Sequence, residues 1–397
     1  MIYKITISNF GSIRDTVELD FRVPGTTPHL PNFRGRSDIP GLRIPAVIAI
    51  LGANGAGKTT VLNAINHTLR FVLHSHNHAA SAVLHPFFSK SGFMRPTRIE
   101  VSFAAAYFLD DDDDRAALYR YELELARDPA NPLSTYVDYE ALLDFPNGRQ
   151  RRIFERKSNE PIHIVREAGI NSRDRAVQAT RPEVSLIATL AASFVPMFVA
   201  IRNNLSRIYS PPESWRPDEE MTANNYTGNA TLVSAASRQL QRIDLGIESI
   251  EVAELPGNRR ELAFVHRGLD VPLVMAQESA GTRNFLSHFP FLSNALDEGQ
   301  VFLLDALDTE FHADLAAEVI HWFQSQETNP HGAQLICTLH NLAVLENLEK
   351  EEVVIVEKDR DGVTTAYGLW QVKGLRRSAN LYREYRSGDL GGVPVIG

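Results

Sequence analysis

The sequence predicts an α/β fold built around a parallel sheet. Residues 46–51 form a short apolar run that is typical of a strand buried on both faces. A glycine-rich turn and an amphipathic helical pattern follow directly. Further strand-like runs at 301–304, 334–338 and 353–357 alternate with helical patterns, which is the rhythm of βαβ units. A chain of 397 residues has room for two or three domains at roughly 100–200 residues each.

Composition excludes several classes of protein. Hydrophobic residues make up 44% and charged residues 22%, which is ordinary for a globular protein with a real core and excludes disordered and collagen-like chains. The single cysteine, Cys337, permits no internal disulfide and no cysteine-based zinc site, so we expect a reducing, cytoplasmic location. A net charge of −9 argues against a generally basic nucleic-acid binder.

The remaining patterns give a coarse outline. Residues 185–201 are apolar over a length that could barely span a bilayer, and we interpret them as a buried core helix rather than a membrane segment. We expect mostly helix over 181–241, with a looser polar stretch at 211–230. A proline- and glycine-rich loop is expected at 24–45. Strands are expected within 1–23 and at 97–109, 118–126, 136–143, 151–155, 250–255 and 261–266.

The strongest chemical signal is a glycine-rich loop that matches G-x-x-x-x-G-K-[ST] at every position. Backbone N–H groups of such a loop, together with the helix N-terminus, attract phosphate. Lys58 is expected to reach the β- and γ-phosphates, and Thr59 to hold Mg²⁺. The predicted nucleotide-binding residues of this loop are Gly52, Ala53, Asn54, Gly55, Ala56, Gly57, Lys58, Thr59 and Thr60.

Three shorter signals lie in the second half of the chain. Asp305 ends the apolar run 301–304, where a carboxylate at a strand edge can bind Mg²⁺. Ser279, Ala280, Gly281 and Thr282 open a helical pattern and offer a hydroxyl and N–H groups to an anion, although a plain helix cap is the alternative. His340 follows the strand 334–338 and could sense the γ-phosphate, where a structural histidine is the alternative.

Three further clusters are interpreted as solvated surface rather than as sites. They are the aspartates 110–114, the alternating histidines His74, His76 and His78, and the basic residues Arg149, Arg151, Arg152, Arg156 and Lys157.

The order of the four motifs resembles that of ABC-type ATPases, specifically the SMC-head and OLD-like branch. Within that branch the chain is similar to AAA-type ATP-binding proteins of bacterial anti-phage and abortive-infection loci. Such proteins are often encoded beside an RloB-like or TOPRIM-nuclease partner, as in the PARIS defence system. The segments that carry this narrower resemblance are 5–10, 244–247, 278–282, 307–312, 329–334, 356–359 and 391–394.

The resemblance implies ATP and Mg²⁺ as cofactors and assigns roles to the motifs. Asn54 corresponds to a residue near the γ-phosphate and the attacking water, and Asp305 to the Walker B aspartate. Ser279 and Gly281 correspond to the signature motif, which acts on nucleotide held by a second subunit. His340 corresponds to the switch histidine. Two chains packed head to tail would bury two ATP molecules, and a single chain would be a poor ATPase.

The chain departs from the family pattern in three ways. Ala306 stands where the family has the glutamate that polarises the attacking water, so hydrolysis is expected to be severely slowed. We interpret Ala306 as an introduced Glu→Ala substitution that traps the ATP-bound state, with a naturally inactive ATPase as the alternative. Leu339 stands where a threonine commonly precedes the switch histidine. The sequence between Asn54 and Arg149 contains no glutamine, so no Q-loop ligand for Mg²⁺ can be assigned.

We therefore expect an SMC-head-like P-loop ATPase without a coiled-coil arm. Its predicted parts are an N-terminal β-rich ATPase lobe (1–126), an insertion of a hairpin and helices (127–240) and a C-terminal ATPase lobe (241–397). The predicted function is an ATP-dependent, oligomerising regulatory subunit of a bacterial defence complex, which controls a separately encoded effector in response to a phage trigger. The alternative is an SMC-like DNA-repair or chromosome-maintenance ATPase that acts on DNA. No membrane association is expected.

Overall fold

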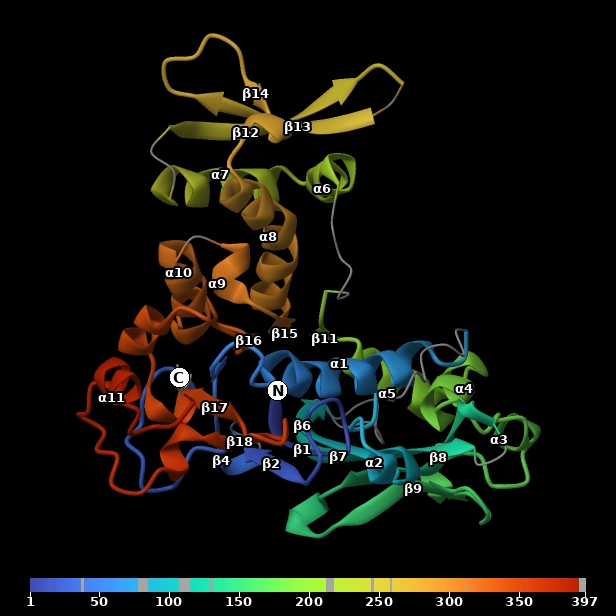
Figure 1. Cartoon of the computed structure of the whole chain (residues 1–397). Coiled ribbons are helices and arrows are strands. Elements are labelled where there is room, and N and C mark those ends of the chain that lie inside the picture. Colours follow the sequence, from blue (N-terminus) through green and yellow to red (C-terminus); the bar gives the residue numbers. More distant parts are fainter. Residues whose placement is uncertain are drawn as a thin grey trace.

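The predicted α/β fold class is confirmed by the computed structural model, which contains two large sheets, a small three-stranded sheet and a hairpin (Figure 1). The structure describes residues 1–36, 39–77, 85–106, 115–128, 131–211, 218–243, 246–257, 259–311 and 313–392.

The central sheet has six strands in the order β11-β15-β16-β5-β17-β18. Its strands are parallel except for β18, which pairs antiparallel with β17. The bounds are β5 (Val47–Leu51), β11 (Ile208–Tyr209), β15 (Val301–Leu304), β16 (Gln334–Thr338), β17 (Val353–Lys358) and β18 (Thr364–Gly368).

Side chains of the central strands alternate between two hydrophobic cores. In β5, Ile48 and Ile50 enter one core, whereas Val47, Ala49 and Leu51 enter the other. The other parallel strands β15, β16 and β17 divide their residues in the same way. Because both faces are covered, these strands read as continuous apolar runs in the sequence.

The first core lies against a seven-stranded antiparallel sheet in the order β10-β9-β8-β7-β6-β1-β2. The strands expected at the N-terminus and between residues 97 and 155 are confirmed as members of this sheet, apart from residues 107–109, which lie outside the described residues. The predicted boundary at residue 126 falls inside β7, so the sheet continues into the predicted insertion. The bounds are β1 (Ile2–Ser8), β2 (Val17–Asp20), β6 (Thr97–Ala106), β7 (Ala116–Asp128), β8 (Asn131–Asp144), β9 (Arg151–Lys157) and β10 (His163–Ile164).

The stretch expected to be a loop at 24–45 contains a β-hairpin of β3 (Phe33–Arg36) and β4 (Ile39–Pro45), so that expectation was wrong. The hairpin forms its own two-stranded sheet, in which each strand has a free edge that tolerates proline. Phe33 and Ile44 are buried beneath it.

The single core helix expected over 185–201 is two helices, α4 (Leu186–Ala192) and α5 (Pro196–Leu205), bent by 119°. Phe194 has a positive φ of 58°, and Pro196 occupies the start of α5, where it lacks the N–H that would continue α4. No single helix among the described residues is long and apolar enough to cross a membrane, although this bent pair has the required length and composition together.

Helices α4 and α5 pack against α1 (Lys58–His74), whose buried residues enter the first core. Helices α8 (Ala280–Glu298) and α10 (Ala313–Gln324) contact strands of the central sheet from the side of the other core. Between β16 and β17 the chain forms 3₁₀ turns at Leu342–Asn347 and Lys350–Glu352 instead of the expected α-helix. Other bounds are α2 (Lys90–Met94), α3 (Arg175–Gln178), α9 (Leu307–Glu310), α10 (Ala313–Gln324) and α11 (Leu381–Ser387).

A separate layer projects beyond the central sheet at the start of α8 (Ala280–Glu298), at the top of Figure 1. It consists of α6 (Glu219–Tyr226), α7 (Ala230–Ile243), β12 (Ile247–Leu255), β13 (Arg259–His266) and β14 (Leu273–Val274). Helix α6 forms within the stretch that was expected to be loose. Asp218 caps its first turn by accepting a hydrogen bond from Met221 N at 2.6 Å, which stabilises the start of the helix. With 19 residues, α8 is the longest described helix, and the described residues contain no coiled-coil arm.

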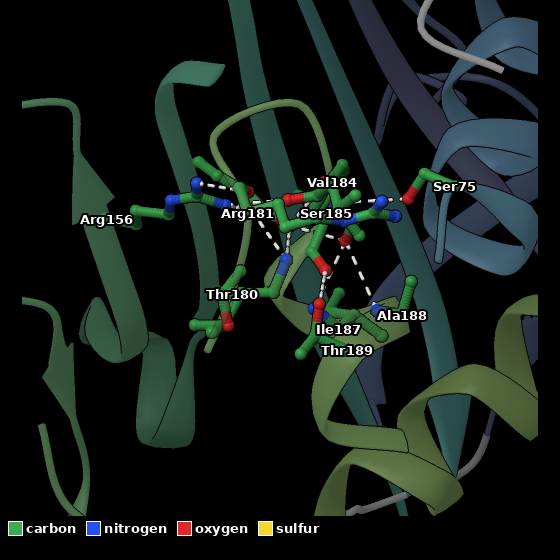
Figure 2. A network of polar contacts seen from close by, with 12 residues as sticks. Ser75, Arg156, Thr180, Arg181, Val184, Ser185, Ile187, Ala188 and Thr189 are labelled. Atoms are coloured by element: carbon green, nitrogen blue, oxygen red, sulfur yellow. Dashed lines mark hydrogen bonds and ion pairs between the residues drawn. The ribbon is translucent and has the colours of Figure 1, made fainter. Parts of the chain in front are cut away.

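A buried polar network fastens α4 to the β-rich sheet. Glu140 on β8 is fully buried and accepts hydrogen bonds from Tyr121 Oη at 2.9 Å, Ser185 Oγ at 2.7 Å and Leu186 N at 2.9 Å. Arg156 lies 3.7 Å from this carboxylate and donates to the backbone carbonyl of Val184 (Figure 2). Because each charge is paired and hydrogen-bonded, the network fixes the start of α4 in one position.

Candidate nucleotide-binding site

The predicted phosphate loop connects β5 to α1 at the carboxyl end of the central sheet. Gly52 lies so close to β17 that a Cβ would stand 2.2 Å from Val356 O. Gly57, the N-cap of α1, has a φ of 113°, and a Cβ there would stand 2.4 Å from Thr364 Oγ1. Both positions therefore require glycine, and the loop is held tightly against β17 and β18.

The N-terminus of α1 is open to an anion. Its N-cap, Gly57, offers no side-chain cap, and its first turn has no acidic residue. The N–H groups of the first turn, which includes Lys58, Thr59 and Thr60, lack carbonyl partners within the helix. The positive end of the helix dipole adds to their attraction for phosphate.

The ammonium group of Lys58 lies against its own loop. Nζ donates to Gly52 O at 2.9 Å and to Ala53 O at 3.3 Å. Burial lowers the pKa of Lys58, and the charges of Asp308 and Asp305 oppose that shift. The cation thus lies inside the cradle that a triphosphate would enter.

The two predicted metal ligands meet directly. Thr59 Oγ1 donates to Asp305 Oδ2 at 2.9 Å, although the two residues are 246 positions apart in the sequence. A hydroxyl and a carboxylate are oxygen donors of the kind that Mg²⁺ prefers; Thr59 lies in the first turn of α1, and Asp305 directly follows β15. The donor set therefore fits Mg²⁺ beside a bound triphosphate.

Thr338 is a site residue that the sequence did not reveal. Its Oγ1 donates to Asp305 Oδ1 and accepts from Ala306 N at 2.7 Å, so it orients both residues that follow β15. Leu339, the position flagged as a departure, is fully buried in the second core. The missed signal was a hydroxyl at the carboxyl end of an otherwise apolar strand.

His340 and Asn54 are brought together, with 2.9 Å between Nδ1 and Oδ1. Because Oδ1 only accepts, His340 Nδ1 donates to it. Asp308 fixes the backbone below this contact, since its Oδ2 accepts the N–H groups of His340 (2.6 Å) and Asn341. The sequence placed Asp308 in a motif but gave no indication of this bond, and His312 of the same motif lies outside the described residues.

Ala306 adopts a left-handed conformation with φ 52° and ψ 46° and begins the short helix α9. Its methyl side chain supplies no proton acceptor at this place. The two carboxylates that flank it along the chain are already engaged, since Asp305 accepts from the hydroxyls of Thr59 and Thr338 and Asp308 accepts from two backbone N–H groups. This turn therefore provides no obvious general base.

A cluster of hydroxyl groups supports the loop from below, and none of its members outside the loop was predicted. Thr364 Oγ1 on β18 donates to Ala56 O at 2.6 Å and lies 2.7 Å from Ser12 Oγ. Ser12 Oγ lies 3.2 Å from Thr60 Oγ1 in the first turn of α1. Residues from both ends of the chain thus hold the loop that lies between them in the sequence.

The predicted signature residues lie elsewhere. Ser279 caps α8 by accepting from Thr282 N at 3.1 Å, Ser279 and Ala280 are exposed, and Gly281 is half-buried. A 19-residue helix is about 28 Å long, so α8 carries this segment far from β15 and Asp305 (Figure 1). Within one chain, the structure brings together the loop, Asp305, Ala306 and His340 but not residues 279–282.

The clusters interpreted as surface show no competing site among the residues described. Four of the five basic residues near β9 have acidic partners: Arg151 pairs with Asp144, Arg152 with Glu155, Arg156 with Glu140 and Lys157 with Glu160. Arg156 is buried, so its interpretation as solvated surface was wrong. The described ranges contain no group of three or more potential metal ligands, and His78 and residues 110–114 lie outside them.

Comparison with protein families identifies a match over most of the chain. Residues 47–346 match the family described as "AAA domain, putative AbiEii toxin, Type IV TA system". The matched region runs from β5 through His340 and includes all four motifs. The chain belongs to this family. Membership in this AAA family implies a nucleotide-binding ATPase domain, in agreement with the loop geometry.

Other comparisons concern only the fold. Among curated proteins, none matches the chain. The structure is similar to an SMC head domain from Thermotoga maritima, with 16% identity, a TM-score of 0.39, and coverage of 92% of this chain and 97% of that one. An Smc head bound to the C-winged helix domain of ScpA has 16% identity and a TM-score of 0.44, with coverage of 92% of this chain and 97% of that one. An Smc head from Pyrococcus furiosus, with an extended coiled coil, has 14% identity and a TM-score of 0.44, with coverage of 92% of this chain and 95% of that one.

The Lys58→Ala variant is expected to lose nucleotide binding. Each charged hydrogen bond to phosphate is worth about 1.5–3 kcal/mol, so affinity should fall by at least about tenfold to a hundredfold. Titration with a fluorescent ATP analogue measures this, and Lys90→Ala, an exposed lysine on α2, is the matched control. Equal affinities for the two variants would contradict the placement of the triphosphate.

Proposed function

We propose that this AAA-domain protein is the ATP-binding regulatory subunit of a bacterial anti-phage defence complex. In this proposal ATP causes two or more copies to associate, and the assembly controls a separately encoded effector. The observation that carries the proposal is the separation of the motifs within one chain. The loop Gly52–Thr60, Asp305 and His340 share one sheet edge, whereas Ser279–Thr282 lies at the far end of α8.

A second copy packed head to tail completes each proposed site. The exposed start of α8 would bring Ser279 and the N–H groups near Gly281 to the triphosphate held by the other copy's loop. Each nucleotide would then bind between two chains, and its loss would separate them. The net charge of −9 and the neutralised basic cluster near β9 favour a protein partner over DNA, the alternative function.

The effector is proposed from the family rather than from the site. The family description refers to a toxin and a type IV toxin–antitoxin system, and the sequence resembles ATPases that are encoded beside RloB-like or TOPRIM-nuclease partners. A phage-derived trigger would act by altering the association of the ATP-bound subunits. Identification of the effector therefore depends on a direct binding experiment.

ATP is expected to drive self-association. In sedimentation velocity, the purified chain should form a dimer or larger assembly with ATP and Mg²⁺ but not with ADP. Ser279→Arg should prevent this by placing bulk and charge at the contact between copies, while leaving the nucleotide affinity of the separated chain unchanged. Asn294→Arg, at an exposed position on the same helix, is the matched control. A chain that stays monomeric with ATP would refute the proposal.

The assembled protein is expected to retain the product of a neighbouring gene during purification. Binding should depend on ATP and be lost in Lys58→Ala, because that variant cannot load nucleotide. Both proteins are co-expressed, one is tagged, and recovery is compared with and without ATP. Salt-sensitive DNA binding together with DNA-stimulated turnover would instead favour the DNA-repair or chromosome-maintenance alternative.

Turnover is expected to be very slow in this chain and to rise in Ala306→Glu. A positioned general base contributes about 10²–10⁴-fold, and glutamate adds no backbone strain beyond that of alanine at φ 52°. Steady-state phosphate release measures the gain. Ala306→Gln, which has the same size without a base, should remain slow; equal rates for the two variants would mean that residue 306 does not face the attacking water.

A further inference from the structure

We propose that His266 and Glu278 form a latch that positions Ser279 for nucleotide held by a second copy of the chain. This inference rests on the function proposed above. Glu278 immediately precedes Ser279, the N-cap of α8, and its Oε1 lies 2.6 Å from His266 Nε2. Neither residue touches the phosphate loop of its own chain, so both are positioning residues.

Both side chains of the latch are largely buried from solvent. The side chains of Glu278 and His266 are only 6% and 16% exposed. A buried carboxylate without a partner is costly, so Glu278 remains inside only while His266 meets it. This dependence gives the backbone before Ser279 one preferred position.

Neighbouring contacts hold the same segment. Gln277 Oε1 accepts from Val274 N at 3.0 Å, and Glu278 N donates to Met275 O at 3.1 Å, while the Met275 side chain is buried. These bonds shape the turn that leads into α8, but they lie within the turn itself. The latch is the side-chain contact that ties the turn to the end of β13.

The anchor of the latch is the projecting sheet. His266 ends β13 and pairs with Ile247 of β12. Leu262 and Phe264 of the same strand are fully buried, and the sheet packs on α6 and α7 (Figure 1). The start of α8 is therefore fixed to a packed layer at the end farthest from β15.

The orientation of Ser279 matters because this residue holds the first turn of α8 through only a few hydrogen bonds. Ser279 Oγ already accepts from Thr282 N, and Ser279 O accepts from Arg283 N at 3.0 Å. Only a correctly directed first turn can also present its N–H groups to a partner's phosphate. Release of Glu278 toward water would fray this turn and misdirect it.

The experiment compares His266→Ala with His266→Gln in the full-length chain. The alanine variant removes the partner of Glu278 and should weaken ATP-dependent association by about tenfold to a hundredfold. The glutamine amide can still donate to Glu278, so that variant should recover most of the association. Arg267→Ala, the next residue, whose side chain is 81% exposed, is the control. Nucleotide affinity of the separated chains should be equal in all four proteins.

Hydrogen exchange of the nucleotide-free monomer provides a readout that needs no dimer. Amides of Thr282 and Arg283, which donate to Ser279, should exchange faster in His266→Ala than in His266→Gln or in the unmodified chain. Unchanged exchange in His266→Ala, or equal loss of association in both His266 variants, would overturn the latch. If the unmodified chain does not associate with ATP, the proposed function fails, and exchange alone decides whether the latch fixes the start of α8.

Discussion

The burial of the central parallel strands on both faces is the constraint on which the candidate site depends. Alternate residues of β5, β15 and β16 enter opposite cores, so these strands cannot slip by one position without exchanging their cores. Their register places the last residues of all three strands at one edge. Thr59 therefore meets Asp305, and Asn54 meets His340, although 246 and 286 positions separate them in the sequence.

Features whose cause is local could be predicted from the sequence. The glycine pattern at Gly52–Thr59 and the apolar runs before Asp305 and His340 each report on a few neighbouring residues, and the structure confirms the strands, the helix and the turns. The sheet order, in which β16 lies between β5 and β15, depends on pairing between distant segments. Thr338 and Thr364 owe their contacts to that pairing, so no local pattern identified them.

The sequence-based predictions were wrong for two segments in which a single residue, rather than the average pattern, determines where a helix ends or begins. Apolar periodicity over 185–201 suggested one helix, but Pro196 and the backbone of Phe194 divide it. Polarity at 211–230 suggested a looser stretch within a mostly helical segment, but the cap supplied by Asp218 starts α6. In each case a terminus signal decided the structure, because helix ends are set by individual hydrogen bonds rather than by average composition.

The residues proposed to hold Mg²⁺ are distinct from position 306, where the general base is expected. Thr338 still orients Asp305 and the backbone N–H of Ala306, and Thr59 still reaches Asp305, so the proposed metal ligands do not depend on the side chain of residue 306. A missing carboxylate there would remove the proton acceptor while leaving the cradle intact. Under the proposed function, such a chain would accumulate the ATP-bound, associated state, because ATP hydrolysis, the step that would separate the two copies, would be lost.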